Sequence, residues 1–401
     1  MRVGVIGLGS MGANHARVLD ELGVLAAVCD SDKLAPCRTS VKRYTTIEGM
    51  LKNQNLDAVT IAVPTSLHCM VGSTVLKAGI PALIEKPLAS TVAEARLLVE
   101  VAKAAGVFLS VGLIERHNPA VIELKKRWGQ LGDVSQMIIR RMGPFPSRVE
   151  DSGVILDLSV HDFDLIRFLT GSTIEFMAGL SSRSIHATRE DAVSCVGMTK
   201  NGILTTIMEN WTTPTKIRDI TVHGAEGMFH VDLLMQDITF YANNYGPASW
   251  EAVSIFRGVS EGDRTQYKID RREPLKQEIS AFLQCVEDGT QDGGTPGIEG
   301  VFALQLSEKL QGMCDGNMAL KKKIEPKLGV KGGAKKEAAP VEKQLTASEK
   351  VRAYLVEHQT CFVTRKRLAD GPNKGKMQAK YTELKGEQLE EVVNSLVSLC
   401  Q

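Results

Sequence analysis

Short apolar runs alternate with longer amphipathic segments through the first 115 residues of the chain. The runs are rich in Val, Ile, Leu and Ala, and they predict buried β-strands at residues 3–6, 25–29, 58–63, 82–85 and 107–111. The segments between them repeat apolar positions every three or four residues and predict helices at residues 11–22, 67–78 and 92–105. Apolar strands joined by helices indicate a parallel sheet covered on both faces, so we expect an α/β domain here.

The pattern changes after residue 118, where a predicted helix at 120–128 is followed by extended segments and turn signals such as Asn201-Gly202 and Glu226-Gly227. The extended segments are expected at residues 136–142, 174–181, 194–199, 202–211, 218–223, 228–231 and 237–241. Helices predicted at 274–287 and 300–314 end this part of the chain. The pattern predicts a second, α+β domain built on a mostly antiparallel sheet.

The composition changes again at residue 321, where Lys, Gly, Ala and Pro predict a basic flexible linker over residues 321–344. Helical periodicity returns at 347–358 and 386–399, and a short strand is expected at 361–364. Residues 345–401 are therefore predicted to form a small α/β module of unknown role. The domains before the linker are expected to cover residues 1–118 and 119–320.

The formal net charge of +1 combines an acidic body with a basic tail, because residues 321–401 carry 17 Lys and Arg against 10 Asp and Glu. Arg365-Lys366-Arg367 and Lys374-x-Lys376 could bind nucleic-acid phosphates through salt-sensitive contacts. The favoured interpretation is a solvated module that packs on the body or mediates assembly, because charge runs usually face solvent.

The overall composition excludes several classes of protein. With 43% hydrophobic residues the chain is not disordered, and no apolar run approaches the ~20 residues that span a bilayer, so no membrane partner is expected. The start runs into a glycine loop and leaves no room for the apolar core of a signal peptide. The eight cysteines form no C-x-x-C pair and no zinc-like spacing, which predicts free thiols, no metal site and a cytoplasmic location.

A glycine loop lies between the first predicted strand and helix. In Gly7-Leu8-Gly9-Ser10-Met11-Gly12, the first glycine permits a tight turn, the second lets a pyrophosphate approach, and the third allows close helix packing. The next strand ends at Asp30, 18 residues after Gly12, where a carboxylate accepts from ribose hydroxyls and repels a 2′-phosphate. We expect a Rossmann domain that binds NAD through Gly7, Gly9, Ser10, Met11, Gly12 and Asp30. Arg38 and Arg43 leave NADP open.

The segment Glu85-Lys86-Pro87 follows a buried strand, at the edge where open α/β sheets bind ligands. Proline keeps Lys86 out of the helical region, so its ammonium can project into the crevice and stabilise a forming alkoxide. Taken alone, a surface lysine at the start of a loop is the favoured alternative.

The second chemical segment runs from Ile155 to Ile166. On a helix, Asp157 and His161 lie four residues apart, Asp164 follows on the same stripe, and the neighbours are largely apolar. A sheltered carboxylate beside an imidazole suits general acid–base catalysis near neutral pH. A structural buried His–Asp pair explains this segment equally well.

Other candidates rest on position alone. Thr65 and His68 follow a strand end and are expected, with Glu85, to line the cofactor, although Thr65 could equally cap a helix. Candidate substrate ligands lie near the domain junction or on later strands: Asn118, Arg140, Arg141 and Arg148. These arginines could bind a phosphate-bearing substrate, and surface arginine is the commoner alternative.

Three motifs occur in order: the loop continued as Met11-Gly12-Ala13-Asn14-His15-Ala16-Arg17, then Glu85-Lys86-Pro87, then Asp157-x-x-x-His161. Together they resemble the Gfo/Idh/MocA family of NAD(P)-dependent oxidoreductases over residues 1–320. The resemblance implies that Lys86, Asp157 and His161 line the active site. It also implies a large open antiparallel sheet, often used for contacts within a homo-oligomer.

Residues 111–121, 141–144 and 153–158 resemble the UDP-N-acetylglucosamine 3-dehydrogenase branch, which implies oxidation of a sugar-nucleotide 3-hydroxyl to a ketone. Leu113 and His117 depart from this branch, which has His and Phe there, and this leaves the exact substrate open. On this hypothesis His161 or Lys86 takes the hydroxyl proton and Asp157 orients the site. Two alternatives are a free sugar or inositol dehydrogenase of the same family, and a non-catalytic NAD-binding sensor or scaffold.

Overall fold

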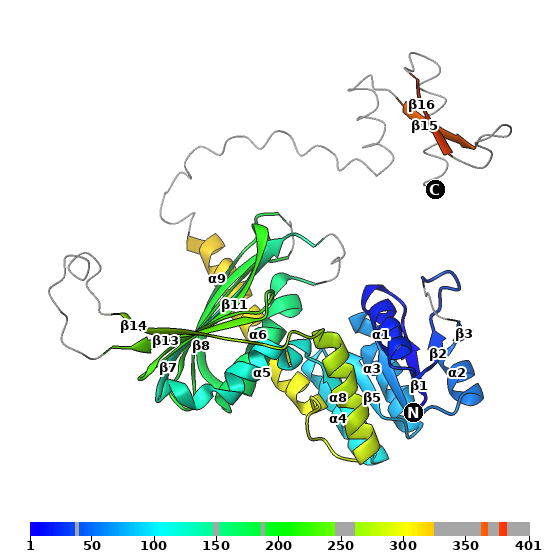
Figure 1. Cartoon of the computed structure of the whole chain (residues 1–401), viewed down its shortest axis with the longest axis horizontal. Helices are drawn as coiled ribbons and strands as arrows, with labels where there is room; N and C mark the ends of the chain where they lie inside the picture. Colours follow the sequence, from blue (N-terminus) through cyan, green and yellow to red (C-terminus); the bar gives the residue numbers. More distant parts are fainter. Residues whose placement is uncertain are drawn as a thin grey trace. The chain divides into compact units, whose positions relative to one another are not determined.

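The computed structural model describes residues 1–36, 40–146, 152–185, 189–244 and 261–324, together with strands at 362–367 and 377–382. The chain divides into two units, Met1–Lys322 and Lys323–Gln401, which are described separately (Figure 1). Within the described residues no helix combines the length and apolar character needed to cross a membrane. Those residues also contain no group of acidic, His or Cys side chains suited to a metal ion.

The first domain is a parallel sheet with helices on its faces, as predicted. Its strands are β1 (Val3–Ile6), β2 (Leu25–Cys29), β3 (Lys42–Tyr44), β4 (Ala58–Ile61), β5 (Ala82–Glu85) and β6 (Leu109–Gly112), in the order β3-β2-β1-β4-β5-β6. Its helices are α1 (Ser10–Glu21), α2 (Ile47–Asn53), α3 (Thr65–Lys77) and α4 (Val92–Ala105). The edge strand β3 was not predicted, because its three partly exposed residues give no apolar run. Helix α2 was not predicted either.

The second domain is built on an eight-stranded sheet. Its strands are β7 (Val134–Pro144), β8 (Ile174–Ser182), β9 (Ala192–Thr199), β10 (Leu204–Asn210), β11 (Thr212–Gly224), β12 (Gly227–Asp232), β13 (Asp237–Asn243) and β14 (Glu261–Tyr267). The order is β14-β13-β12-β11-β7-β10-β9-β8, and only the β7–β10 pair is parallel, so the predicted mostly antiparallel sheet is confirmed. Strand β14 was missed because its sequence is polar throughout.

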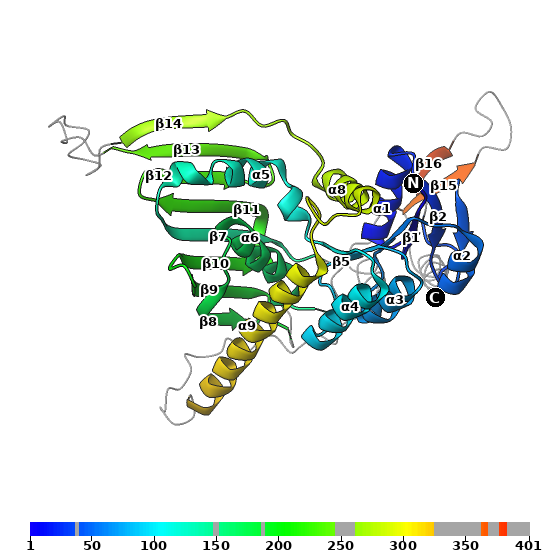
Figure 2. The same cartoon turned by 90° about the horizontal axis from the view of Figure 1, so that it is seen from below.

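The two faces of this sheet differ. Figure 2 shows α5 (Pro119–Lys126), α6 (Val160–Thr170) and α9 (Gly297–Ile324) on one face, where their apolar residues join the sheet in one core. Short 3₁₀ turns, Ile114–His117 and Trp128–Leu131, flank α5. Alternate residues of β8, β9 and β10 point away from that core and expose large apolar side chains: Phe176, Leu180, Val196, Met198, Leu204 and Met208.

Later residues return to the first domain. Helix α8 (Pro274–Asp288) contributes Ile279 and Phe282 to the core beneath β1, and α9 contributes Val301 and Leu304 to the opposite side of the same sheet. The predicted segment 119–320 therefore also supplies elements that cover the first domain. Helix α9 extends to residue 324, beyond the predicted end at 314 and into the predicted linker.

In the second unit, β15 (Phe362–Arg367) pairs with β16 (Met377–Thr382) in an antiparallel hairpin. Strand β15 overlaps the predicted strand at 361–364 and carries Arg365-Lys366-Arg367. The helices predicted at 347–358 and 386–399 lie outside the described residues, as does the predicted linker from residue 325 onward. Nucleic-acid binding by this basic segment stays a prediction.

Candidate active site

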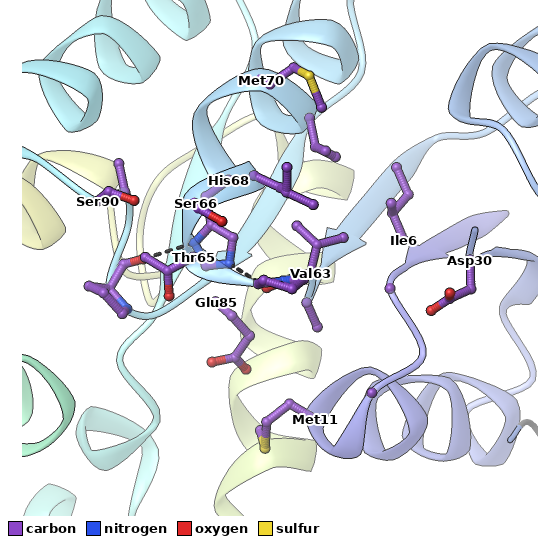
Figure 3. Close-up of a pocket in the computed structure, with 18 of the residues that line it drawn as sticks. Ile6, Met11, Asp30, Val63, Thr65, Ser66, His68, Met70, Glu85 and Ser90 are labelled. Carbon is purple, nitrogen blue, oxygen red and sulfur yellow. Dashed lines mark hydrogen bonds between the residues drawn. The ribbon is translucent and has the colours of Figure 1, made fainter. Parts of the chain in front are cut away.

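A pocket of about 980 Å³ lies at the carboxyl ends of the parallel strands (Figure 3). In the stick view Asp30 lies at the right, Met11 at the bottom, and Thr65 and His68 left of the centre. The structure brings most of the predicted cofactor and catalytic residues to this pocket: Gly7, Gly9, Ser10, Met11, Asp30, Thr65, His68, Glu85, Lys86 and Asp157. These residues come from the ends of separate strands and from the second domain.

The glycine loop has the backbone that a bound pyrophosphate requires. Gly7 has φ of +87°, and a Cβ atom there would lie 2.6 Å from the Ala62 carbonyl oxygen. A Cβ atom at Gly12 would lie 1.8 Å from the Gly7 carbonyl oxygen, whereas nothing lies within 4 Å of one at Gly9. Gly7 and Gly12 are therefore fixed by packing, and Gly9 leaves space beside the first N–H groups of α1, so the loop fits a dinucleotide.

Asp30 is fixed at the end of β2 by backbone donors. Its Oδ2 accepts from the Leu8 N–H at 2.6 Å and its Oδ1 from the Asp32 N–H at 2.9 Å. A carboxylate has further acceptor capacity, so Asp30 can still receive ribose hydroxyls. Arg43 donates to the Lys33 carbonyl at 2.8 Å, and Arg38 lies outside the described residues.

Thr65 and His68 line the pocket, and His68 also connects two of the loops around it. Thr65 is the first residue of α3, whose N-cap is Pro64, so Thr65 is not the cap. The ring nitrogens of His68 each lie 2.9 Å from a backbone carbonyl, one of Pro87 and one of Val63. Burial lowers the pKa of His68 and so opposes the charged ring that could donate to both carbonyls, whereas the two carbonyl contacts act to raise it. Through these contacts His68 connects the loops that follow β4 and β5.

Glu85 forms a buried pair that the sequence did not predict. Its Oε1 lies 2.8 Å from Nε2 of His15, which is fully buried on α1, and its Oε2 accepts from the Lys86 N–H at 3.1 Å. Burial acts to raise the pKa of Glu85, but the hydrogen bond and charge of His15 and the charge of Lys86 lower it below its usual range. The ionised Glu85 therefore anchors the backbone that carries Lys86.

Lys86 and Asp157 join the two domains at the edge of the pocket. The Lys86 ammonium donates to Asp157 Oδ1 at 2.6 Å and to the Asp157 carbonyl at 2.9 Å. The sequence placed Asp157 on the same helical stripe as His161. Residues Ile155–Ser159 instead form a π-helical turn ahead of α6, and a wider turn changes the direction of Asp157 relative to that stripe.

His161 lies on the first turn of α6 and is nearly buried. Burial and the charges of Lys86, Arg141 and Arg218 lower the pKa of His161 well below its usual value. Its Nδ1 atom has no hydrogen-bond partner within the part of the chain that the structure describes. Because Nδ1 is buried, a substrate hydroxyl cannot reach it, and a neutral imidazole would accept a proton through the other ring nitrogen, Nε2.

A buried charge network supports this segment. Arg141, with 2% of its side chain exposed, lies 2.7 Å from Glu115 and 2.8 Å from Asp162. Glu209 hydrogen-bonds Ser159, and burial with the neighbouring Asp162 raises the pKa of Glu209 well above its usual range. Asp164, expected on the same stripe as His161, instead binds Arg116 with bonds of 2.6–2.9 Å.

The predicted substrate ligands do not line the pocket, and neither do the predicted site residues Gly12 and His161. Arg141 belongs to the buried network, and Arg140 pairs with Asp219 through bonds of 2.9 and 2.6 Å. Asn118 caps α5 by accepting from the Ala120 N–H, and its amide donates to Glu115 and to the Leu233 carbonyl. Arg148 lies outside the described residues. The substrate roles of these residues stay predictions, and the contacts of Asn118, Arg140 and Arg141 give each a structural function.

Arg218 was not among the residues predicted for the site, although a strand was predicted to begin there. Arg218 lies on the same face of β11 as the buried Ile220 and Val222, and its charge acts on His161. The sequence did contain a signal for this. Residues 218, 220 and 222 lie on the same face of the strand, and Arg218 is a cation in a row that is otherwise apolar.

Two family models match the chain. One, described as the oxidoreductase family's NAD-binding Rossmann fold, matches residues 1–113, and the GFO/IDH/MocA C-terminal domain matches residues 127–230. Together they span more than half of the chain. The five cysteines that the structure describes are free thiols: Cys29, Cys69, Cys195, Cys285 and Cys314.

Individual relatives include dehydrogenases of two substrate classes. UDP-N-acetylglucosamine 3-dehydrogenase of Acidithiobacillus ferrooxidans is 27% identical over 71% of this chain and 88% of its own length. Myo-inositol 2-dehydrogenase of Thermotoga maritima is 26% identical over 82% of this chain and 98% of its own length. A solved structure of the A. ferrooxidans enzyme superposes with a TM-score of 0.69 at 25% identity, covering 79% of this chain and 98% of that one. The chain belongs to the Gfo/Idh/MocA family of NAD-dependent oxidoreductases, which act on CH–OH groups.

Proposed function

We propose that this chain oxidises a ring hydroxyl of a sugar nucleotide with NAD, and that the favoured substrate is the 3-hydroxyl of UDP-N-acetylglucosamine. The observation that carries the chemistry is the Lys86–Asp157 pair at the edge of the dinucleotide pocket, next to the neutral His161. The similarity to the A. ferrooxidans enzyme supports the choice of substrate.

In this proposal the Gly7–Gly12 loop and Asp30 hold NAD, whose nicotinamide supplies the hydride acceptor. Lys86 donates a hydrogen bond to the substrate hydroxyl oxygen and stabilises the negative charge that develops there. Asp157 keeps the ammonium in place through the 2.6 Å bond. His161 is in the neutral form needed to accept the hydroxyl proton.

The two departures from the sugar-nucleotide branch lie in the interior. Leu113 is 1% exposed, His117 is buried with its Nε2 3.3 Å from Thr295 Oγ1, and neither lines the pocket. Burial lowers the pKa of His117 to about 4, so it is a neutral packing residue near neutral pH. These positions therefore give no direct reason to prefer another substrate.

The runner-up is oxidation of inositol or a free sugar, supported by the match to nearly the whole length of the Thermotoga enzyme. A panel of UDP-N-acetylglucosamine, N-acetylglucosamine and myo-inositol, each incubated with protein and NAD, separates the two. We expect NADH formation and a 3-keto product, identified by mass spectrometry, with the nucleotide sugar. Turnover of inositol with none of the UDP-sugar would replace the proposal by its runner-up.

We also propose that the open face of the large sheet mediates a homo-oligomer. The apolar side chains of β8, β9 and β10 on this face are 38–67% exposed, and large exposed apolar patches commonly mark protein interfaces. Light scattering of the purified chain tests this proposal, and a monomer at micromolar concentration would contradict it.

A further inference from the structure

Two neighbouring cross-strand pairs of β7 and β11 differ in charge: one joins a cation to an anion, and the other joins two cations. Arg140 is directly across from Asp219, and Arg141 is directly across from Arg218. The first pair is an ion pair with 2.6 Å between nitrogen and oxygen. The second places two cations opposite each other, which is unfavourable unless carboxylates neutralise both.

The neighbouring carboxylates lie closer to Arg141 than to Arg218. Arg141 lies 2.7 Å from Glu115 and 2.8 Å from Asp162. The Arg218 guanidinium shares Glu115 at 3.8 Å, and it donates no hydrogen bond to any residue in the described ranges. The side chain of Arg218 is 37% exposed, so its neighbours in the chain do not cover it completely.

Arg218 also acts through its charge on the residues proposed as catalytic, although it does not line the dinucleotide pocket itself. Its charge is one cause of the lowered pKa of His161, and Asp157 in turn acts on Arg218. Burial and the charge of Arg141 lower the pKa of Arg218 itself, so keeping this guanidinium charged costs free energy in the folded protein. An anion bound at the guanidinium would relieve that cost.

We propose that Arg218 binds an anionic group of the substrate, a phosphate or a carboxylate close to the ring that is oxidised, and thereby selects charged sugars over neutral polyols. The guanidinium fork matches both anions through paired N–H donors. A neutral inositol offers no charge-assisted bond at this position. The inference rests on the proposed function and identifies the chemical class of its substrate.

The test compares Arg218→Gln and Arg218→Lys in the full chain with NAD and four substrates: UDP-N-acetylglucosamine, its uronate, free glucuronate and myo-inositol. For the charged substrates we expect kcat/KM of the Gln variant to fall by about 10–100-fold, mainly through KM. The Lys variant should lose less, because it keeps the charge but not the fork. Arg271→Gln, which breaks an exposed pair with Asp237, is the matched control for loss of one arginine.

A purely structural role predicts a different result. Removing Arg218 relieves repulsion with Arg141, so we expect the melting temperature of Arg218→Gln to stay level or rise, with an unchanged Kd for NAD. An equal loss of activity with inositol and with the charged substrates would overturn the inference. So would a loss that follows Arg140→Gln instead of Arg218→Gln.

The same panel separates this inference from the proposed function. If the wild type oxidises UDP-N-acetylglucosamine and Arg218→Gln does so equally well, the inference fails and the function stands. If glucuronate is oxidised in an Arg218-dependent way and the UDP-sugar is not, the inference stands and the function fails. A loss confined to UDP-N-acetylglucosamine identifies the phosphate as the group bound, and a loss confined to glucuronate identifies the carboxylate. Turnover of inositol alone contradicts both.

Discussion

The two sides of the candidate active site are held in different ways. On the first-domain side, Asp30 and Glu85 occupy strand ends and accept from backbone N–H groups of Leu8, Asp32 and Lys86, with the single side chain of His15 as a further partner of Glu85. On the second-domain side, the segment with Asp157 and His161 rests on buried side-chain charges, chiefly Arg141 with Asp162 and Glu115. Strand-end positions follow from the sheet itself, whereas the charge network depends on each partner being present.

Lys86 is where the two sides meet, so its removal should have the largest effect. Lys86→Ala loses both the proposed hydrogen bond to the reacting oxygen and the contact with Asp157. We expect kcat to fall by about 10²–10⁴-fold while the Kd for NAD stays the same, measured by NADH formation and by calorimetry. Lys77→Ala, at the exposed end of α3, is the control. A rate equal to that of the wild type with NAD bound would exclude Lys86 from catalysis.

Arg141 and Arg140 test the second-domain side as a matched pair of neighbours. Arg141→Met leaves two buried carboxylates without their main partner and should lower the free energy of unfolding by about 3–5 kcal/mol. Arg140→Met breaks a pair whose arginine is 44% exposed and should cost about 0–1 kcal/mol. Urea titrations of both variants give the comparison. Similar small losses would show that the network does not hold this side of the site.

The difference between the two sides also explains how far the sequence could be interpreted. The glycine loop, Asp30 and Lys86 were predicted from contiguous motifs, and the structure places them around one pocket. Arg141 was predicted to be a phosphate ligand. Its carboxylate partners are 21 and 26 residues away in the sequence, and only folding brings them together, so the buried network could not be predicted. One signal was available: adjacent strand residues face opposite sides, so either Arg140 or Arg141 had to point into the core.

The conformation of the turn that carries Asp157 also could not be predicted from the sequence. Helical spacing predicted a pair of Asp157 with His161, but a π-helical turn over Ile155–Ser159 precedes α6, and Asp157 binds Lys86 from 71 residues away. No pattern of apolar positions distinguishes one wide turn from an α-helical turn. The sequence therefore singled out Lys86, Asp157 and His161 as candidates, whereas the contact between Lys86 and Asp157 could not be predicted from it.

Glu209 gives a further test of the buried charges on the second-domain side, with the smallest expected effect on stability. Burial and Asp162 raise the pKa of Glu209 well above its ordinary 4.5, so the folded state holds this proton more tightly than the unfolded state. The stabilising contribution is complete below the unfolded pKa and is lost as pH rises through the folded pKa, at about 1.4 kcal/mol for each pH unit between them.

Glu209→Gln mimics the protonated carboxyl and removes this titration. The variant should therefore unfold at the same urea concentration as the wild type in acid and at a higher one above neutral pH, where the wild type carries the cost of ionising Glu209. Glu175→Gln, at an exposed position of β8, controls for the loss of one carboxylate. If Glu209→Gln is instead the less stable protein at neutral pH, Glu209 is ionised in the native state and adds a third negative charge to the carboxylates around Arg141.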